Sequence, residues 1–97
     1  VEYEFYCCDV LKSITLPKVT TVGDRGFWAC YYLETLTFGS VVTTINDNNG
    51  EVFYDLGYKI GGCHLVLNRE QVNVEGLAPD LANNTWAGYT WKSITLK

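Results

Sequence analysis

Four cysteines and a single histidine are the residues of this chain with the most reactive side chains. Thiolates and imidazoles bind zinc, and a histidine beside a nucleophile is the usual general base. Here they form the adjacent pairs Cys7-Cys8 and Cys63-His64, whereas zinc ligands are typically separated by about two to four residues. No nucleophile motif surrounds His64. The sequence therefore predicts no metal, no cofactor and no catalytic residue, and we expect His64 on the surface of a strand.

Two of the cysteines belong to an internal repeat. Cys8 and Cys30 hold equivalent places in the pattern F-x-x-C-x-x-L-x-x-[IL]-x-[LF], which occurs twice. Repeats of this length indicate stacked coils, so these two cysteines fill the interior as small hydrophobes or join neighbouring coils as a disulfide. Cys7 is expected to point outward, and Cys63 lies outside the repeated cysteine position. The matched residues are Phe5, Cys8, Leu11, Ile14 and Leu16, then Phe27, Cys30, Leu33, Leu36 and Phe38.

The repeated segments alternate as strands do. Ile14 and Leu16 share one face of an extended segment, and Ser13 and Thr15 share the other. The five residues from Lys12 to Leu16 recur unchanged at 92–96. The same alternation predicts a mostly β fold with a parallel sheet whose strands lie near 12–16, 33–38, 63–67 and 92–96. Its outward face would carry two rows of side chains: Ser13, Thr35, His64 and Ser93, then Thr15, Thr37, Val66 and Thr95.

The repeat is regular in one half of the chain and irregular in the other. Residues 1–97 are expected to form one domain, with regular coils over 1–52 and irregular capping coils over 53–97. Each regular coil also contains a second apolar pair, Val19-x-x-Val22 in one and Val42-x-x-Ile45 in the next. In the irregular half we expect a glycine-rich bend at 57–62, a loop over 68–84 with one helical turn at 79–82, and a closing coil containing two tryptophans, Trp86 and Trp91.

Composition excludes several function classes. The net charge of −4 and the scattered seven lysines and arginines argue against nucleic-acid binding. No apolar run approaches the roughly 20 residues of a membrane-spanning helix. The chain enters a repeat almost at once, so we expect a mature fragment that lacks a leader and further upstream repeats. If upstream repeats are removed, the first strand has an open edge, which favours self-association.

One known family is similar to this pattern. The residues Leu11-x-x-Ile14-x-Leu16-Pro17, followed by Val22-Gly23-Asp24-Arg25-Gly26-Phe27-x-x-Cys30, resemble the BspA-like leucine-rich repeat, best known from surface proteins of Bacteroides, related bacteria and some protists. The resemblance covers residues 5–45, with Gly26 replacing the usual alanine and Gly39 the usual proline. It implies a short right-handed solenoid with a parallel sheet on its concave face, little helix, no catalytic activity and a place on the bacterial cell surface.

Two functions follow from such a fold. The first is non-enzymatic binding of a protein or cell-surface ligand, because solenoids present an extended concave surface. The alternative is a purely structural cap of a longer repeat array. An exposed aromatic patch would favour binding, an evenly polar surface would favour the cap, and an enzyme would require a deep pocket holding His64. The residues expected on the binding face are Ser13, Thr15, Glu34, Thr35, Thr37, His64, Val66, Ser93 and Thr95, flanked by Lys12 and Lys92.

Overall fold

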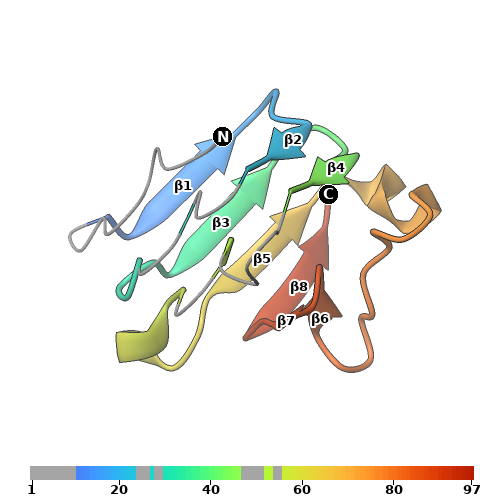
Figure 1. The fold of residues 1–97 in the computed structure, drawn as a ribbon. Coiled ribbons are helices and arrows are strands. Elements are labelled where there is room, and N and C mark those ends of the chain that lie inside the picture. The colour runs from blue at the N-terminus through green and yellow to red at the C-terminus, as the bar shows by residue number, and fades with distance from the viewer. Residues whose placement is uncertain (1–10, 24–26, 28–29, 47–51, 54–55) are drawn as a thin grey trace.

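A four-stranded parallel sheet dominates the structure. The computed structural model describes residues 11–23, 27, 30–46, 52–53 and 56–97. The sheet has the order β1-β3-β5-β8, which is also the order along the chain (Figure 1). The mostly β prediction and all four strand positions are confirmed, with each strand one or two residues shorter at its start. The strands are β1 (Ser13–Leu16), β3 (Thr35–Phe38), β5 (His64–Leu67) and β8 (Ser93–Leu96).

The register of this sheet follows the predicted alternation. Ile14, Leu36, Leu65 and Ile94 lie side by side on the inward face. Leu36 and Leu65 are fully buried in the two central strands, whereas Ile94 on an edge strand is half-buried. The outward rows are also confirmed, since Thr35 lies between Ser13 and His64, and His64 pairs with Ser93.

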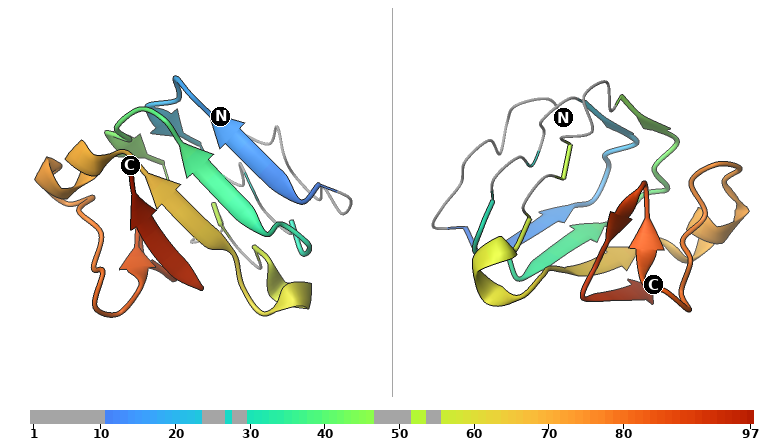
Figure 2. Two further views of the ribbon diagram at one scale, coloured as in Figure 1. Left: turned by 180° about the vertical axis from the view of Figure 1, so that it is seen from behind. Right: turned by 60° about the horizontal axis from the view of Figure 1, so that its bottom comes forward.

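A second, shorter parallel sheet joins the two regular coils. It consists of β2 (Thr21–Val22) and β4 (Thr44–Ile45), each of which contains the second residue of an apolar pair, Val22 or Ile45. Backbone bonds extend it, from Thr43 N to Thr20 O at 2.9 Å and from Asn46 N to Val22 O at 2.9 Å. The pair lies beyond the C-terminal ends of β1 and β3, where the chain turns away from the large sheet (Figure 2).

The third coil begins with a short insertion at the predicted glycine-rich bend. Gly57 and Gly61 flank a 3₁₀ helix, η1 (Tyr58–Ile60), and both have positive φ angles of 68° and 85°. At Gly57 a Cβ would lie 2.6 Å from the carbonyl carbon of Gly62, so a side chain cannot be accommodated there. The bend is therefore confirmed, and glycine is required at its first residue.

The prediction for 68–84 is wrong in two respects. Residues Arg69–Asn73 form a 3₁₀ helix, η2, whose N-terminus is capped by the side chain of Asn68 accepting a bond from Glu70 N. The expected helical turn at 79–82 is instead part of a turn closed by a bridge between Asp80 and Thr85. Asp80 accepts bonds from the Asn83 side chain and from the backbone of Ala82 and Asn83. These bonds, chiefly those from Asn83, hold the pKa of Asp80 below its usual range.

The closing coil contains an antiparallel hairpin that the sequence did not predict. Its strands are β6 (Thr85–Trp86) and β7 (Tyr89–Thr90). The hairpin brings both expected tryptophans inward, with Trp86 2% and Trp91 5% exposed. Trp86 donates its indole N–H to Leu77 O at 2.7 Å, and Trp91 donates to Trp86 O at 3.2 Å. Both buried indoles therefore have hydrogen-bond partners, as buried tryptophan requires.

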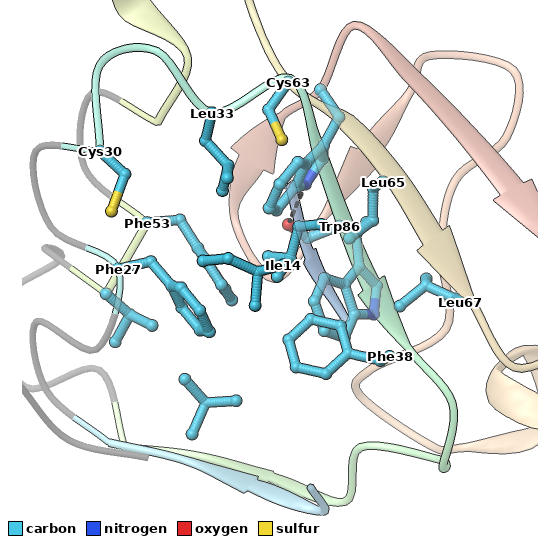
Figure 3. Packing of buried hydrophobic residues seen from close by; sticks show 14 of the residues in the cluster. Ile14, Phe27, Cys30, Leu33, Phe38, Phe53, Cys63, Leu65, Leu67 and Trp86 are labelled. Atoms are coloured by element: carbon cyan, nitrogen blue, oxygen red, sulfur yellow. Dashed lines mark hydrogen bonds between the residues drawn. The ribbon is translucent and has the colours of Figure 1, made fainter. Parts of the chain in front are cut away.

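One apolar cluster fills the space enclosed by the coils (Figure 3). Phe53 lies at its centre, stacked on Phe27 at 5.6 Å between ring centroids and edge-on to Trp91 at 5.1 Å. Trp86 packs against Phe38 from β3 at 5.8 Å. Aromatic rings from regular and irregular coils therefore share a single core. The fully or nearly fully buried members include Val22, Phe27, Cys30, Leu33, Leu36, Phe38, Val42, Val52, Leu65 and Leu67.

Candidate functional site

The outward face of the large sheet is lined by hydroxyl-bearing residues. We define the outward face as Ser13, Thr15, Thr35, Thr37, His64, Val66, Ser93 and Thr95. These side chains are exposed or half-buried, in contrast to the inward-facing residues of the two central strands, which are buried. Across this face His64 Nδ1 lies 2.6 Å from Ser93 Oγ, a hydrogen bond that joins β5 to β8. The face presents mostly small polar groups to the solvent.

A small pocket opens at the N-terminal ends of the strands beside the outward face. Its volume is about 140 Å³, and it is lined by Glu34, Ile60, Gly62, His64 and Lys92. We call this the mixed-charge pocket because it combines a carboxylate, an ammonium group and an imidazole. Glu34, His64 and Lys92 are all exposed. These groups can bind ligands that carry both donors and acceptors, and the pocket stays open to water.

Backbone hydrogen bonds place the charged residues of the pocket in one row. His64 N donates to Glu34 O at 2.8 Å, and Lys92 N donates to Cys63 O at 2.9 Å. Glu34, Cys63 and Lys92 are therefore equivalent residues, each directly before its strand. Gly62 forms the wall of the pocket at a φ of 123°, where a Cβ would lie 3.2 Å from Lys92 Cβ. A glycine here allows the backbone of the bend to approach Lys92 closely.

Cys63 lies in the same row as Glu34 and Lys92, but its side chain is buried whereas theirs are exposed. Its side chain is 2% exposed and its thiol lies 3.5 Å from His64 O. Burial, with a smaller contribution from the nearby Cys30, raises the pKa of the Cys63 thiol to about 12. The thiol is therefore protonated at neutral pH and a poor nucleophile. Cys30 is also buried, as the repeat predicts, while Cys7 and Cys8 lie outside the described residues.

A second pocket also borders the bend, through Tyr58 and Cys63. It has a volume of about 230 Å³, and we call it the aromatic pocket. Tyr58 belongs to its rim, is 62% exposed and contacts Tyr31 edge-on at 6.2 Å. Lys59 Nζ lies 5.5 Å from the Tyr58 ring and 6.0 Å from the Tyr31 ring. The pocket is lined by Phe53, Leu56, Tyr58, Cys63, Tyr89, Thr90 and Trp91.

The structure gathers some of the predicted site residues and separates others. It brings Glu34, His64 and Lys92 into one pocket, whereas Lys12 lies at the far edge of the sheet beside β1. Sequence reasoning missed Ile60 and Gly62, which belong to the insertion and have no counterpart in the regular coils. The sequence signal that could have revealed the pocket was the glycine-rich bend directly before Cys63-His64. An insertion beside a sheet face can form one wall of a pocket.

Other kinds of site find no support in the described part of the chain. Within it, no cluster of three or more histidine, cysteine or acidic side chains is arranged to hold a metal ion. No helix in the same part is long and apolar enough to cross a membrane. The polar run from Asn46 to Glu51 has the composition of a solvated turn, and its residues 47–51 lie outside the described part of the chain.

Comparisons with family models, with curated proteins and with solved structures gave no match for this chain. The similarity to BspA-like repeats therefore stays a prediction that depends on the residues of the first two coils.

Proposed function

We propose that this chain is a non-enzymatic binding module that recognises a protein or cell-surface ligand through its outward face. The observation that carries the proposal is the mixed-charge pocket, where Glu34, His64 and Lys92 border the hydroxyl rows. Together they combine a broad, weakly specific surface with a local set of charged groups. Specific interfaces commonly depend on a few such anchoring positions within a larger contact area.

The proposed architecture is a short leucine-rich-repeat solenoid. Its support is the agreement in register between successive coils, which pair through β1 and β3 and again through β2 and β4. We propose membership of the BspA-like group on the resemblance of residues 5–45. A bacterial cell-surface location and a role in adhesion follow from that resemblance alone.

Binding accounts for the pocket better than catalysis does. Glu34 and His64 lie in one pocket, as an acid–base pair would, but both side chains are exposed. Catalytic sites gain much of their electrostatic strength from excluding water. An exposed pocket of about 140 Å³ does not provide that environment. The contact between Tyr31 and the exposed Tyr58 also favours a recognition surface, since exposed aromatic groups are enriched at interfaces.

A structural cap is the second candidate function. It is favoured by Trp86 and Trp91, whose burial closes the core on the side of the last coil. Terminal repeats of solenoids commonly differ from the internal ones because they must cover the core. A cap has no need of the mixed-charge pocket, so the pocket distinguishes the two candidates.

An adhesion assay with matched variants tests the proposal. Beads coated with the chain would be applied to cultured epithelial cells and to whole bacteria. The test variant combines Glu34→Ala, His64→Ala and Lys92→Ala, and the control combines Glu75→Ala, Thr44→Ala and Lys18→Ala, which are also exposed and change the charge equally. We expect the test variant to bind at least about tenfold more weakly and the control to bind as the wild type does.

Two results would contradict the proposal. Equal binding by the test variant and the wild type would exclude the mixed-charge pocket as the anchor. Wild-type beads that adhere to neither cell type better than uncoated beads would favour the structural cap.

A further inference from the structure

The two edges of the large sheet have the same sequence. β1 and β8 both read Ser-Ile-Thr-Leu, and both follow a lysine, Lys12 in one case and Lys92 in the other. They lie at opposite edges of the sheet order β1-β3-β5-β8. Among the described strands, β1 pairs with β3 alone and β8 with β5 alone. Figure 1 shows these two strands as the first and last members of the sheet.

The apolar side chains of the edge strands are incompletely covered. Ile14 in β1 is buried, but Leu16 in β1 and both Ile94 and Leu96 in β8 are half-buried, whereas Leu36 and Leu65 in the central strands are fully buried. The core therefore reaches both edges with apolar surface still accessible. A further strand placed beside either edge would bury that surface and pair the backbone at the same time.

We infer that the partner of the β8 edge is the β1 edge of a second copy of this chain. Each row of side chains in the sheet begins with a residue of β1 and ends with the equivalent residue of β8. When β8 of one copy pairs with β1 of the next, every row therefore continues into the second copy. Ser93 would lie beside Ser13 of the second copy, and Ile94 beside its Ile14, as Ile94 lies beside Leu65 within one copy. Because each copy uses two different edges, the contact is head-to-tail and extends into linear chains of copies.

Charge limits the strength of this contact. The residues directly before the two strands become neighbours, so Lys92 would lie beside Lys12 of the next copy. Within one copy the neighbour of Lys12 in that row is Glu34, whose N–H bonds Lys12 O at 2.7 Å. Like charges side by side oppose pairing, and lysines at strand edges are a common means of preventing it. The junction therefore forms more readily at high salt, where the repulsion is screened.

Charge reversal at the two lysines tests this geometry. Sedimentation velocity of residues 1–97 would be measured over a wide concentration range for the wild type, K12E, K92E and the double variant, at low and high salt. Each single variant converts a Lys–Lys neighbour pair into Glu–Lys, so we expect the association constant to rise about three- to tenfold at low salt. The double variant restores a like-charge pair and should return to the wild-type value.

The control is K59E, which changes the net charge equally on the exposed insertion, away from both edges. It should associate as the wild type does, and circular dichroism should be the same for all variants. Three results would overturn the inference: monomers for every protein throughout the range, equal association of the single variants and K59E, or a double variant that associates as strongly as the single ones. The last result would indicate pairing between two like edges.

Discussion

Neighbouring coils are held together differently in the two regions of this molecule. Over residues 11–46 the backbone pairs twice in each coil, once in the large sheet and once between β2 and β4. From residue 56 onward the large sheet continues, but among the described strands β4 gains no strand on its other side. Just before β4 a side chain pairs with the backbone instead, since Gln71 Oε1 accepts from Val42 N at 2.8 Å and Gln71 Nε2 donates to Val42 O at 2.9 Å.

This substitution keeps the irregular region in register with the regular one. Gln71 lies 29 residues after Val42, and Asn68 lies 29 residues after Gly39, whose carbonyl accepts a bond from the Asn68 side chain at 2.9 Å. The strands β3 and β5 pair at the same offset. The coil therefore continues after the backbone pairing of the shorter sheet has stopped, because amide side chains present a donor and an acceptor as a peptide group does. This coil differs from the regular ones because side chains, and not backbone groups, form these hydrogen bonds.

Truncating Trp86, which is more deeply buried than Trp91, should give the greatest loss of stability. Trp86→Ala removes a 2% exposed ring that packs on Phe38 and Phe53, so we expect the free energy of unfolding to fall by about 3–5 kcal/mol. Urea unfolding followed by circular dichroism measures this loss. The control Leu81→Ala removes a 48% exposed side chain and should change stability by no more than about 0.5 kcal/mol. Similar values for the two variants would show that the closing coil contributes little to the core.

Truncating a core leucine of the regular region should lower the free energy of unfolding slightly less than truncating Trp86. Leu33 is fully buried before β3, and Leu33→Ala should cost about 2–5 kcal/mol because it leaves a cavity. Leu16→Ala, at the half-buried edge, should cost less. The midpoint of urea unfolding reports both. A melting temperature unchanged by Leu33→Ala would mean that the repeat register is wrong.

Gln71→Ala tests whether a side chain replaces the missing strand. It leaves the N–H and carbonyl of Val42 without the partners seen here, and we expect a loss of about 1–3 kcal/mol for such buried groups. Gln71 is 0% exposed, whereas its neighbour Asn73 is exposed, so Asn73→Ala provides the control. Hydrogen exchange at Val42 should accelerate in Gln71→Ala alone. Unchanged exchange would argue against the proposed substitution of strand by side chain.

The thiol of Cys63 makes the irregular region sensitive to alkaline pH. Its pKa rises from 9.0 to about 12 on burial, so the unfolded chain loses this proton before the folded chain does. The stabilising contribution is complete below pH 9 and is lost as pH rises towards 12, by about 1 kcal/mol per pH unit. The difference in unfolding free energy between wild type and Cys63→Ala, measured from pH 8 to 11, isolates this effect. A difference independent of pH would contradict the assigned burial.

Substitutions on the outward face should have the smallest effect. Thr15→Ala and Thr95→Ala change exposed side chains, and we expect each to alter the unfolding free energy by less than about 0.5 kcal/mol. Differential scanning calorimetry compares them with the inward Ile14→Ala, which should lower the melting temperature clearly. A large loss at Thr15 would mean that the outward rows stabilise the sheet and are not simply available for binding.

The strands were predictable because their signal is local. Alternation at Ser13–Leu16 sets the two faces, and recurrence of that pattern sets which strands are neighbours. The hairpin at Trp86 and Tyr89 and the burial of Gln71 were not predictable in this way. Nothing in the sequence around a glutamine of a polar segment indicates that it is buried. Its hydrogen-bond partners, the N–H and carbonyl of Val42, lie 29 residues earlier. The pocket also escaped prediction, because the segment that contains Ile60, Gly62 and His64 meets Glu34 and Lys92 only once the strands of the sheet have paired.

The sequence by itself therefore determined the large parallel sheet, its register, its inward and outward faces and the place of Trp86 and Trp91 in a closing coil. These features depend on side-chain period and on repetition, which are properties of the chain order. The tertiary structure decided how the coils join after β4, where Cys63 lies and which charged groups share a pocket. Those outcomes depend on hydrogen bonds and packing between residues that are distant in the sequence. Such contacts form, and stabilise the fold, only once the coils are stacked.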